Sequence, residues 1–163
     1  MASDMFLQID GIEGESTDDQ HAKWIEISSF SSGVSQEVSG AVSTGGARST
    51  NRCDHQDFSI THVLDSSSPK IALACANGTH IPKITVQLHR ATGEKAMYAE
   101  YIMENVFVTA AMPTGSFGGE LPVEVVNFNY AKITWKYIPT DHLTGVAGSP
   151  VEAYWDLGTN TGA

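Results

Sequence analysis

Apolar and polar side chains alternate along several stretches of this chain, and this period of two limits the fold more than any other feature. Between residues 80 and 90, Ile84, Val86 and Leu88 share one side of an extended backbone and polar side chains share the other. Such alternation is typical of a β-strand with one buried face. Related stretches occur at residues 5–9, 23–27, 58–64, 98–110, 123–137 and 151–157. The sequence therefore predicts a mainly β protein of about eight strands.

One segment carries the signals of an α-helix instead. Ser68 is a candidate N-cap, and Pro69 suits the first helical position because no backbone N–H is needed there. Asn77 and Gly78 provide a left-handed stop. The apolar face, at i, i+3 and i+4 spacing, consists of Ile71, Ala74 and Cys75. A helix of about ten residues is marginal alone, so we expect it to pack on the sheet.

The longest candidate strand, residues 123–137, changes the side of its apolar residues partway along. The first set is Val126, Phe128 and Tyr130, and the second is Ile133, Trp135 and Tyr137. A slip of one residue indicates a β-bulge near Ala131 or Lys132. Burial of the two sheet faces at different places explains the slip equally well.

Residues 34–54 contain few large apolar side chains and many Ser and Gly residues. We expect an extended loop here. Connections of this length are usually functional or mobile, because most loops in compact domains have only about 4–6 residues.

Size and charge exclude several classes of function. The chain has 163 residues, which predicts a single domain over residues 1–163. Its net charge of −10 disfavours binding to nucleic acid and to anionic membranes, because both need clustered Lys and Arg. We see neither a membrane-spanning apolar run of about 20 residues nor a conventional signal peptide. We therefore expect folding in the cytoplasm, and export, if any, by another route.

Candidate chemical sites are weak. Cys53, His55 and Asp57 alternate on one face, and with His62 they are conceivable zinc ligands, but no CxxC or HExxH motif supports them. A polar loop edge is the better interpretation, so we predict no metal and no cofactor. Serines and histidines are plentiful, but no GxSxG elbow is present, and we predict that the chain is not an enzyme.

The two cysteines and three tryptophans also have structural interpretations. We expect free thiols, with Cys75 buried under the helix and Cys53 accessible. Trp24, Trp135 and Trp155 are candidates for a sugar-stacking platform, although burial in a core or an interface is the favoured interpretation for tryptophans in alternating strands.

An ordered set of residues along nearly the whole chain resembles the haemolysin-coregulated protein (Hcp) family. The residues that carry the resemblance are Asp4, Met5, Phe6, Gly14, Glu15, Ser16, Asp18, His21, Ile25 and Ile27, then residues 65–69 (Asp-Ser-Ser-Ser-Pro), Cys75 and residues 78–82 (Gly-Thr-His-Ile-Pro). Strand pattern alone favours a barrel or a sandwich. The resemblance implies an antiparallel β-barrel with one short α-helix packed on its side and a long extended loop.

The resemblance also implies a function. Proteins of this family build the inner tube of bacterial type VI secretion systems as stacked homohexameric rings. The implied partners are other copies of the chain, effectors carried in the lumen, and the sheath and spike proteins. The implied location is the cytoplasm before firing and the extracellular space afterwards.

Two sets of residues follow as candidate sites. The lumen-facing set, on one phase of a strand with small polar side chains, is Ser29, Ser31 and Gly33. The ring-stacking set, in the long loop, is Ser39, Gly45, Gly46, Arg48 and Arg52. The acidic turn at residues 16–20 of the next ring is a possible acceptor for the two arginines. The alternatives are a phage-tail-like tube protein outside type VI secretion, a soluble β-barrel binding module, and a metal-dependent enzyme.

Overall fold

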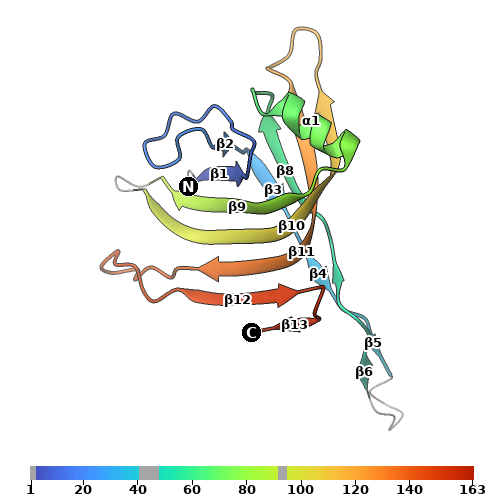
Figure 1. The fold of residues 1–163 in the computed structure, drawn as a ribbon. Helices are drawn as coiled ribbons and strands as arrows, with labels where there is room; N and C mark the ends of the chain where they lie inside the picture. The colour runs from blue at the N-terminus through green and yellow to red at the C-terminus, as the bar shows by residue number, and fades with distance from the viewer. Residues whose placement is uncertain (1–2, 41–47, 92–94) are drawn as a thin grey trace.

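The computed structural model describes residues 3–40, 48–91 and 95–163, which form a curved antiparallel sheet, one helix and a projecting arm (Figure 1). The strands of the large sheet are β1 (Ser3–Ile9), β2 (Ile25–Glu26), β3 (Ser29–Ser31), β8 (Phe58–Val63), β9 (Ile81–Arg90), β10 (Ala96–Thr114), β11 (Val123–Tyr137), β12 (Val151–Asp156) and β13 (Thr161–Gly162). The arm contains β4 (Val34–Ser35), β5 (Val38–Ser39), β6 (Ser49–Thr50) and β7 (Asp54–His55). The helix is α1 (Ser68–Asn77). The mainly β prediction is confirmed.

The large sheet follows the order β13-β12-β11-β10-β9-β1-β2, and β8 and β3 branch from β11. In the described part of the chain no backbone ladder joins the two ends of this path, so the strand order does not itself close a barrel. One short segment nevertheless reaches both branches. Ile27 donates its N–H to the carbonyl of Met5 on β1, and Ser28 donates its N–H to the carbonyl of Thr61 on β8.

The two halves of β11 have different neighbours, and this explains its change of phase. Residues 123–128 pair with β8, whereas residues 132–137 pair with β12. The expected bulge near Ala131 or Lys132 is wrong, because the register with β10 is the same at Lys132 and at Tyr130. The register shifts instead on β10, between Val108 and Ala110. The second interpretation, burial of different faces in the two halves, agrees with the structure.

The core lies inside the curve of the sheet and beneath the helix. Its largest fully buried apolar side chains are Leu7, Ile25, Phe58, Ile60, Ile71, Ile84, Met103, Phe128 and Ile133. Most of them occupy the apolar phase of a strand, because alternate residues of a strand face the same side of a sheet. On β8 and β9 the alternation in the sequence therefore identified the buried face correctly, whereas in the first half of β10 the buried residues are Ala99 and Met103, on the phase opposite to Tyr98 and Ile102.

Helix α1 packs against β10. Its N-cap is Ser67, one residue before the predicted Ser68, and Pro69 lies in the first turn as expected. Gly78 ends the helix in the left-handed conformation, with φ of 66°, and donates its N–H to the carbonyl of Ala74. Glycine reaches this conformation without the steric cost that a Cβ brings.

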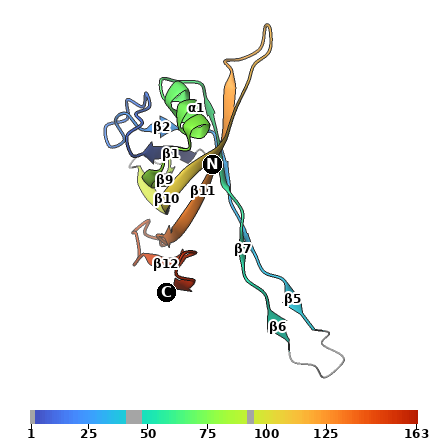
Figure 2. The same ribbon diagram turned by 45° about the vertical axis from the view of Figure 1, so that its right-hand side comes forward.

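The long loop predicted for residues 34–54 is instead a two-stranded arm that projects from the sheet (Figures 1 and 2). Val34 pairs with His55 at its base, and Val38 pairs with Thr50 further out. Both short ladders are antiparallel, and their residues are exposed apart from the half-buried His55. The sequence shows no apolar alternation here because neither face of the arm is buried within the chain.

Candidate functional site: the arm, its base and the polar sheet face

The base of the arm is fixed to the sheet by an aromatic contact and a hydrogen bond. Nδ1 of His55 lies 3.0 Å from the hydroxyl of Tyr130 on β11, and the His55 ring stacks on Trp135 at 6.4 Å between centroids. Burial raises the pKa of Tyr130 to about 12. Burial also lowers the pKa of His55, against an opposing influence of Asp54. Both shifts favour the neutral pair at ordinary pH.

A second attachment lies where the arm enters β8. The carboxylate of Asp57 accepts hydrogen bonds from Oγ1 of Thr109 on β10, at 2.6 Å, and from Nδ2 of Asn129 on β11, at 3.1 Å. A charged acceptor makes such hydrogen bonds stronger than neutral ones. Asp57 therefore attaches the base of the arm to β10 and β11.

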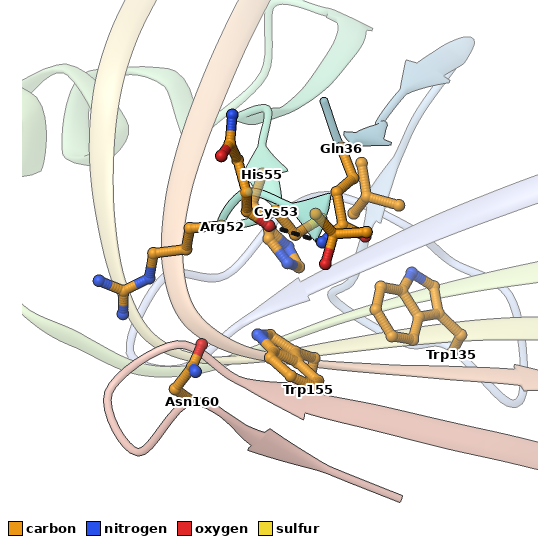
Figure 3. Close-up of a pocket in the computed structure, with 10 residues that line it drawn as sticks. Gln36, Arg52, Cys53, His55, Trp135, Trp155 and Asn160 are labelled. Atoms are coloured by element: carbon orange, nitrogen blue, oxygen red, sulfur yellow. Dashed lines mark hydrogen bonds between the residues drawn. The ribbon is translucent and has the colours of Figure 1, made fainter. Parts of the chain in front are cut away.

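A cleft of about 770 Å³ lies between the arm and the β11–β12 hairpin (Figure 3). Trp135 and Trp155 project into it from the hairpin, and Arg52 reaches across from the arm (Figure 3). Nη2 of Arg52 donates to the carbonyl of Leu157, at 3.3 Å. The remaining lining residues are Val34, Gln36, Thr50, Asn51, Cys53, His55 and Asn160. None of these described lining residues carries a carboxylate, so the cleft has a cationic character.

The predicted lumen residues lie on a face of small side chains. Ser29 and Ser31 are exposed on β3 and pair with Thr61 and Ser59 of β8, so all four side chains share one side of the sheet. Ser59 pairs in turn with Asn127 of β11, which extends the same side across a third strand. We call these five residues the polar face.

Gly33, the third predicted lumen residue, is half-buried where β3 leads into the arm. A Cβ at this position would lie 3.0 Å from Oε1 of Gln56. Gly33 also accepts a hydrogen bond at its carbonyl from the N–H of Gln56. Close packing between the two strands is therefore the observed role of this glycine.

The predicted stacking residues are only partly within the described structure. The hydroxyl of Ser39 lies 2.6 Å from that of Ser49, across the β5–β6 ladder. Arg48 and Arg52 are exposed. Gly45 and Gly46 lie outside the described residues.

The acidic turn proposed as the acceptor for the arginines is partly engaged within its own chain. Asp18 pairs with Lys95 and accepts a hydrogen bond from His21 at 2.9 Å. These contacts, that with Lys95 first, hold the pKa of Asp18 well below its usual range. Asp19 remains exposed.

The four conceivable zinc ligands have other partners. Cys53, His55 and Asp57 do share the inward phase, as their alternation predicted, but His55 contacts Tyr130 and Asp57 contacts Thr109. His62 is buried on β8. Among the residues that the structure describes, no three His, Cys, Asp or Glu side chains gather in a way that holds a metal ion.

Both cysteines are free and half-buried. The expected contrast, with Cys75 buried under the helix and Cys53 accessible, is therefore absent, although Cys75 does pack against the core that contains Ile71 and Ala74. Trp135 packs against the core on one side and lines the cleft on the other. No helix in the described part of the chain has the length and apolar character that crossing a membrane requires.

Sequence analysis missed a buried hydrogen-bonded pair, His62 and Glu124, between β8 and β11. Nε2 of His62 lies 2.9 Å from Oε2 of Glu124, and both residues are at most 2% exposed. The sequence does contain a sign of this pair, because His62 lies on the same side of its strand as the apolar Phe58 and Ile60. A polar residue on a buried phase needs a partner, because an unpaired charge in a core is costly.

Comparison with known proteins identifies the family of this chain. A family model described as "Type VI secretion system effector, Hcp" matches residues 6–137. "Protein hcp1" of Pseudomonas aeruginosa is 33% identical over 164 residues, which cover 100% of both chains. The "Major exported protein" of the same organism is 29% identical over 105 residues, which are 58% of each chain.

Solved structures show the same likeness. One described as "Structure of a type six secretion system protein" has a TM-score of 0.92 and 32% identity, and covers 99% of this chain and 100% of its own. The crystal structure of Hcp1 from Salmonella typhimurium has a TM-score of 0.79 and 28% identity, with 100% of both chains covered. These matches define a structural class, the secreted β proteins of type VI secretion systems. The chain belongs to the Hcp family and is a tube component of the type VI secretion system.

Proposed function

We propose that this protein assembles into homohexameric rings, and that these rings stack into the inner tube of a type VI secretion system. The arm is the observation that carries this proposal. A two-stranded ribbon is at best marginally stable in water, yet this ribbon projects with almost every residue exposed. A neighbouring copy that packs on the arm provides the burial that its own chain does not.

The body of each subunit is a barrel in this proposal. Residues 25–31 run from β1 to β8, and they donate hydrogen bonds to both strands through Ile27 and Ser28. This segment therefore connects β1 with β8, which share no strand pairing of their own. A closed sheet has no free edge to pair with other proteins, which suits a subunit whose contacts must be specific.

The polar face lines the lumen, with Ser29 and Ser31 toward the cargo and Gly33 at its edge. Small uncharged side chains leave space and bind water readily, which suits a channel wall. Ser31→Gln adds bulk at six positions of a hexamer, so cargo retention should fall while rings persist. Dissociation of the hexamer would place Ser31 in a packed contact, and unchanged cargo would place it outside.

The arm joins successive rings through Ser39, Gly45, Gly46, Arg48 and Arg52. The two exposed arginines carry positive charge in a chain of net charge −10, so acidic surfaces of the next ring are suitable acceptors. Charge reversal with Arg48→Glu and Arg52→Glu should leave rings intact and abolish tubes in electron micrographs. Persistence of tubes would contradict this assignment.

The partners beyond the tube are effectors in the lumen and the sheath and spike proteins. Subunits await firing in the cytoplasm and reach the extracellular space as part of the tube. The name "Major exported protein" of the Pseudomonas aeruginosa relative supports an exported role. Membership of a structural tube family supports a role without catalysis.

Native mass spectrometry tests the assembly directly. The monomer has a mass of 17.5 kDa, and the proposal expects a species six times heavier at micromolar concentration. A spectrum that contains only the monomer across this range would overturn the proposal.

A further inference from the structure

The loop between β11 and β12 holds an apolar side chain in the solvent. Leu143 is 96% exposed and Val146 is 64% exposed. The turn is nevertheless ordered, because Oδ1 of Asp141 accepts hydrogen bonds from the N–H groups of Leu143, at 2.7 Å, and Thr144, at 3.1 Å. The N–H of Asp141 also donates to the carbonyl of Val146, at 3.0 Å. Leu143 is therefore presented on a preorganised turn, which costs little conformational entropy when it binds.

The cleft beneath the arm offers a complementary surface. Its two tryptophans give it a broad apolar wall, and the volume of about 770 Å³ is far larger than one leucine side chain. Tryptophan and arginine are the residue types that most often dominate the energy of protein interfaces. Trp135, Trp155 and Arg52 are all present here.

The charges of the two surfaces are opposite. Asp141 is the acidic residue of the turn, and its hydrogen bonds from the backbone lower its pKa, so it is ionised at neutral pH. Arg52 is the cation of the cleft, and none of the described residues that line the cleft carries a carboxylate. Opposite charges across a contact favour the correct partner and accelerate encounter.

The two surfaces belong to different parts of the fold. In Figure 1 the loop between β11 and β12 lies at the left-hand end of these strands, whereas the arm leaves the sheet on the right. A contact between two different surfaces of identical subunits is heterologous, and such contacts generate closed rings when the rotation closes. An occupant that comes from a second copy of the chain therefore fits the geometry.

We propose that the β11–β12 turn of one subunit inserts Leu143 into the tryptophan cleft of the next subunit, and that repetition of this contact closes the ring. This inference rests on the proposed hexamer and specifies its subunit contact. It also gives the base of the arm a role in ring closure, separate from the stacking assigned to the outer arm.

A charge substitution provides the first test. Leu143→Glu would place a carboxylate against the apolar wall that Trp135 and Trp155 form, whereas Phe117→Glu is a matched control on the exposed β10–β11 loop. Leu143→Glu should give monomers at concentrations where the wild type is hexameric, at least a tenfold loss of association. Phe117→Glu should leave the ring intact, and circular dichroism should be unchanged in both variants because both side chains are exposed.

The native thiol of Cys53 provides the second test, because Cys53 lines the cleft. Under mild oxidation, Leu143→Cys should give a ladder of linked chains, up to six, on a non-reducing gel. The ladder should vanish when Cys53→Ser is added, and Phe117→Cys should not produce it. A hexamer that survives Leu143→Glu would overturn the inference, and so would a ladder that is absent or independent of Cys53.

Failure of this inference is distinguishable from failure of the proposed function. A wild-type protein that is never hexameric contradicts the ring itself. A wild-type hexamer that tolerates Leu143→Glu contradicts only the contact between the turn and the cleft.

Discussion

The body and the arm are built from the same kind of strand but are stabilised in different ways. In the body, one face of each long strand is buried, and the fully buried Phe58 and Phe128 are partners across β8 and β11. In the arm, the paired residues Val38 and Thr50 are both exposed. The comparison teaches that strand pairing alone does not make a stable element, and that an arm without a buried face depends on its attachment and on partners.

The attachment of the arm is correspondingly polar and specific. His55 contacts Tyr130, and Asp57 contacts both Thr109 and Asn129. A hydrogen bond requires a particular distance and angle between its groups, whereas the burial of apolar surface is non-directional. The base of the arm therefore sets the direction in which the arm projects.

The largest effect is expected from a cavity in the body. Phe128→Ala should lower the free energy of unfolding by about 3–5 kcal/mol, because the removed ring is fully buried and leaves a void. Val38→Ala, at an exposed position of the arm, is the matched control and should cost about 0.5 kcal/mol or less. Urea denaturation of the isolated subunit measures both. Equal losses would show that the arm is stabilised within its own chain.

A smaller effect is expected at the joint between the two regions. Tyr130→Phe should cost about 1 kcal/mol, because it removes the hydrogen bond with His55 and leaves the ring in place. Tyr137→Phe, at a largely exposed tyrosine of the same strand, is the control.

The same tyrosine predicts a dependence on alkaline pH. The pKa of Tyr130 is raised from 10.0 to about 12, so between these values the folded protein keeps a proton that the unfolded chain has lost. Stability should therefore fall as pH rises from about 10 to 12, and Tyr130→Phe should fall less steeply. Urea denaturation at each pH measures the free energy of unfolding. The same dependence of this free energy on pH in the wild type and in Tyr130→Phe would contradict the prediction.

Acid should also weaken the joint, by a smaller amount because the His55 ring is half-exposed. Burial lowers the pKa of His55 below 6.5, so in mild acid the unfolded chain binds a proton more readily than the folded one. Its contribution to stability is present above pH 6.5 and is lost as pH falls through the folded pKa. His89 shifts in the same direction, so the comparison must be between the wild type and His55→Gln. Parallel pH profiles for these two proteins would count against the prediction.

The smallest effect is expected in the outer arm. Ser39→Ala removes an exposed hydrogen bond with Ser49 and should change the free energy of unfolding by about 0.5 kcal/mol or less. Thermal unfolding of monomer and ring, compared side by side, measures it. A larger loss in the ring than in the monomer would show that this part of the arm is buried by a neighbour.

Sequence reasoning was most reliable where one face of an element is buried. The strands around Ile84 and Phe58 and the helix around Ile71 lie where the alternation and the cap signals placed them. It was least reliable in residues 34–54, where the strands of the arm lack a buried phase. The cysteine prediction failed for Cys75 in a related way, because a helical face defines a direction and not a depth of burial.

The candidate site was recovered unevenly. The sequence correctly put Cys53, His55 and Asp57 on one face, but the partners of His55 and Asp57, which are Tyr130, Thr109 and Asn129, come from strands more than 50 residues away. Spacing along a chain contains no information about such contacts. The cleft shares this origin, because its arm side and its tryptophan side are distant in sequence.

The sequence by itself determined which side of β8 and of β9 is buried, where the helix begins and ends to within a residue, and which family the chain resembles. These properties depend on neighbours within a few positions, and the period of apolar residues encodes them. Only the tertiary structure decided that residues 34–40 and 48–55 form a projecting arm, that His62 meets Glu124, and that two tryptophans face that arm across a cleft. Those features depend on how distant strands are brought together, and it is this long-range packing that creates the surfaces a neighbouring subunit can bind.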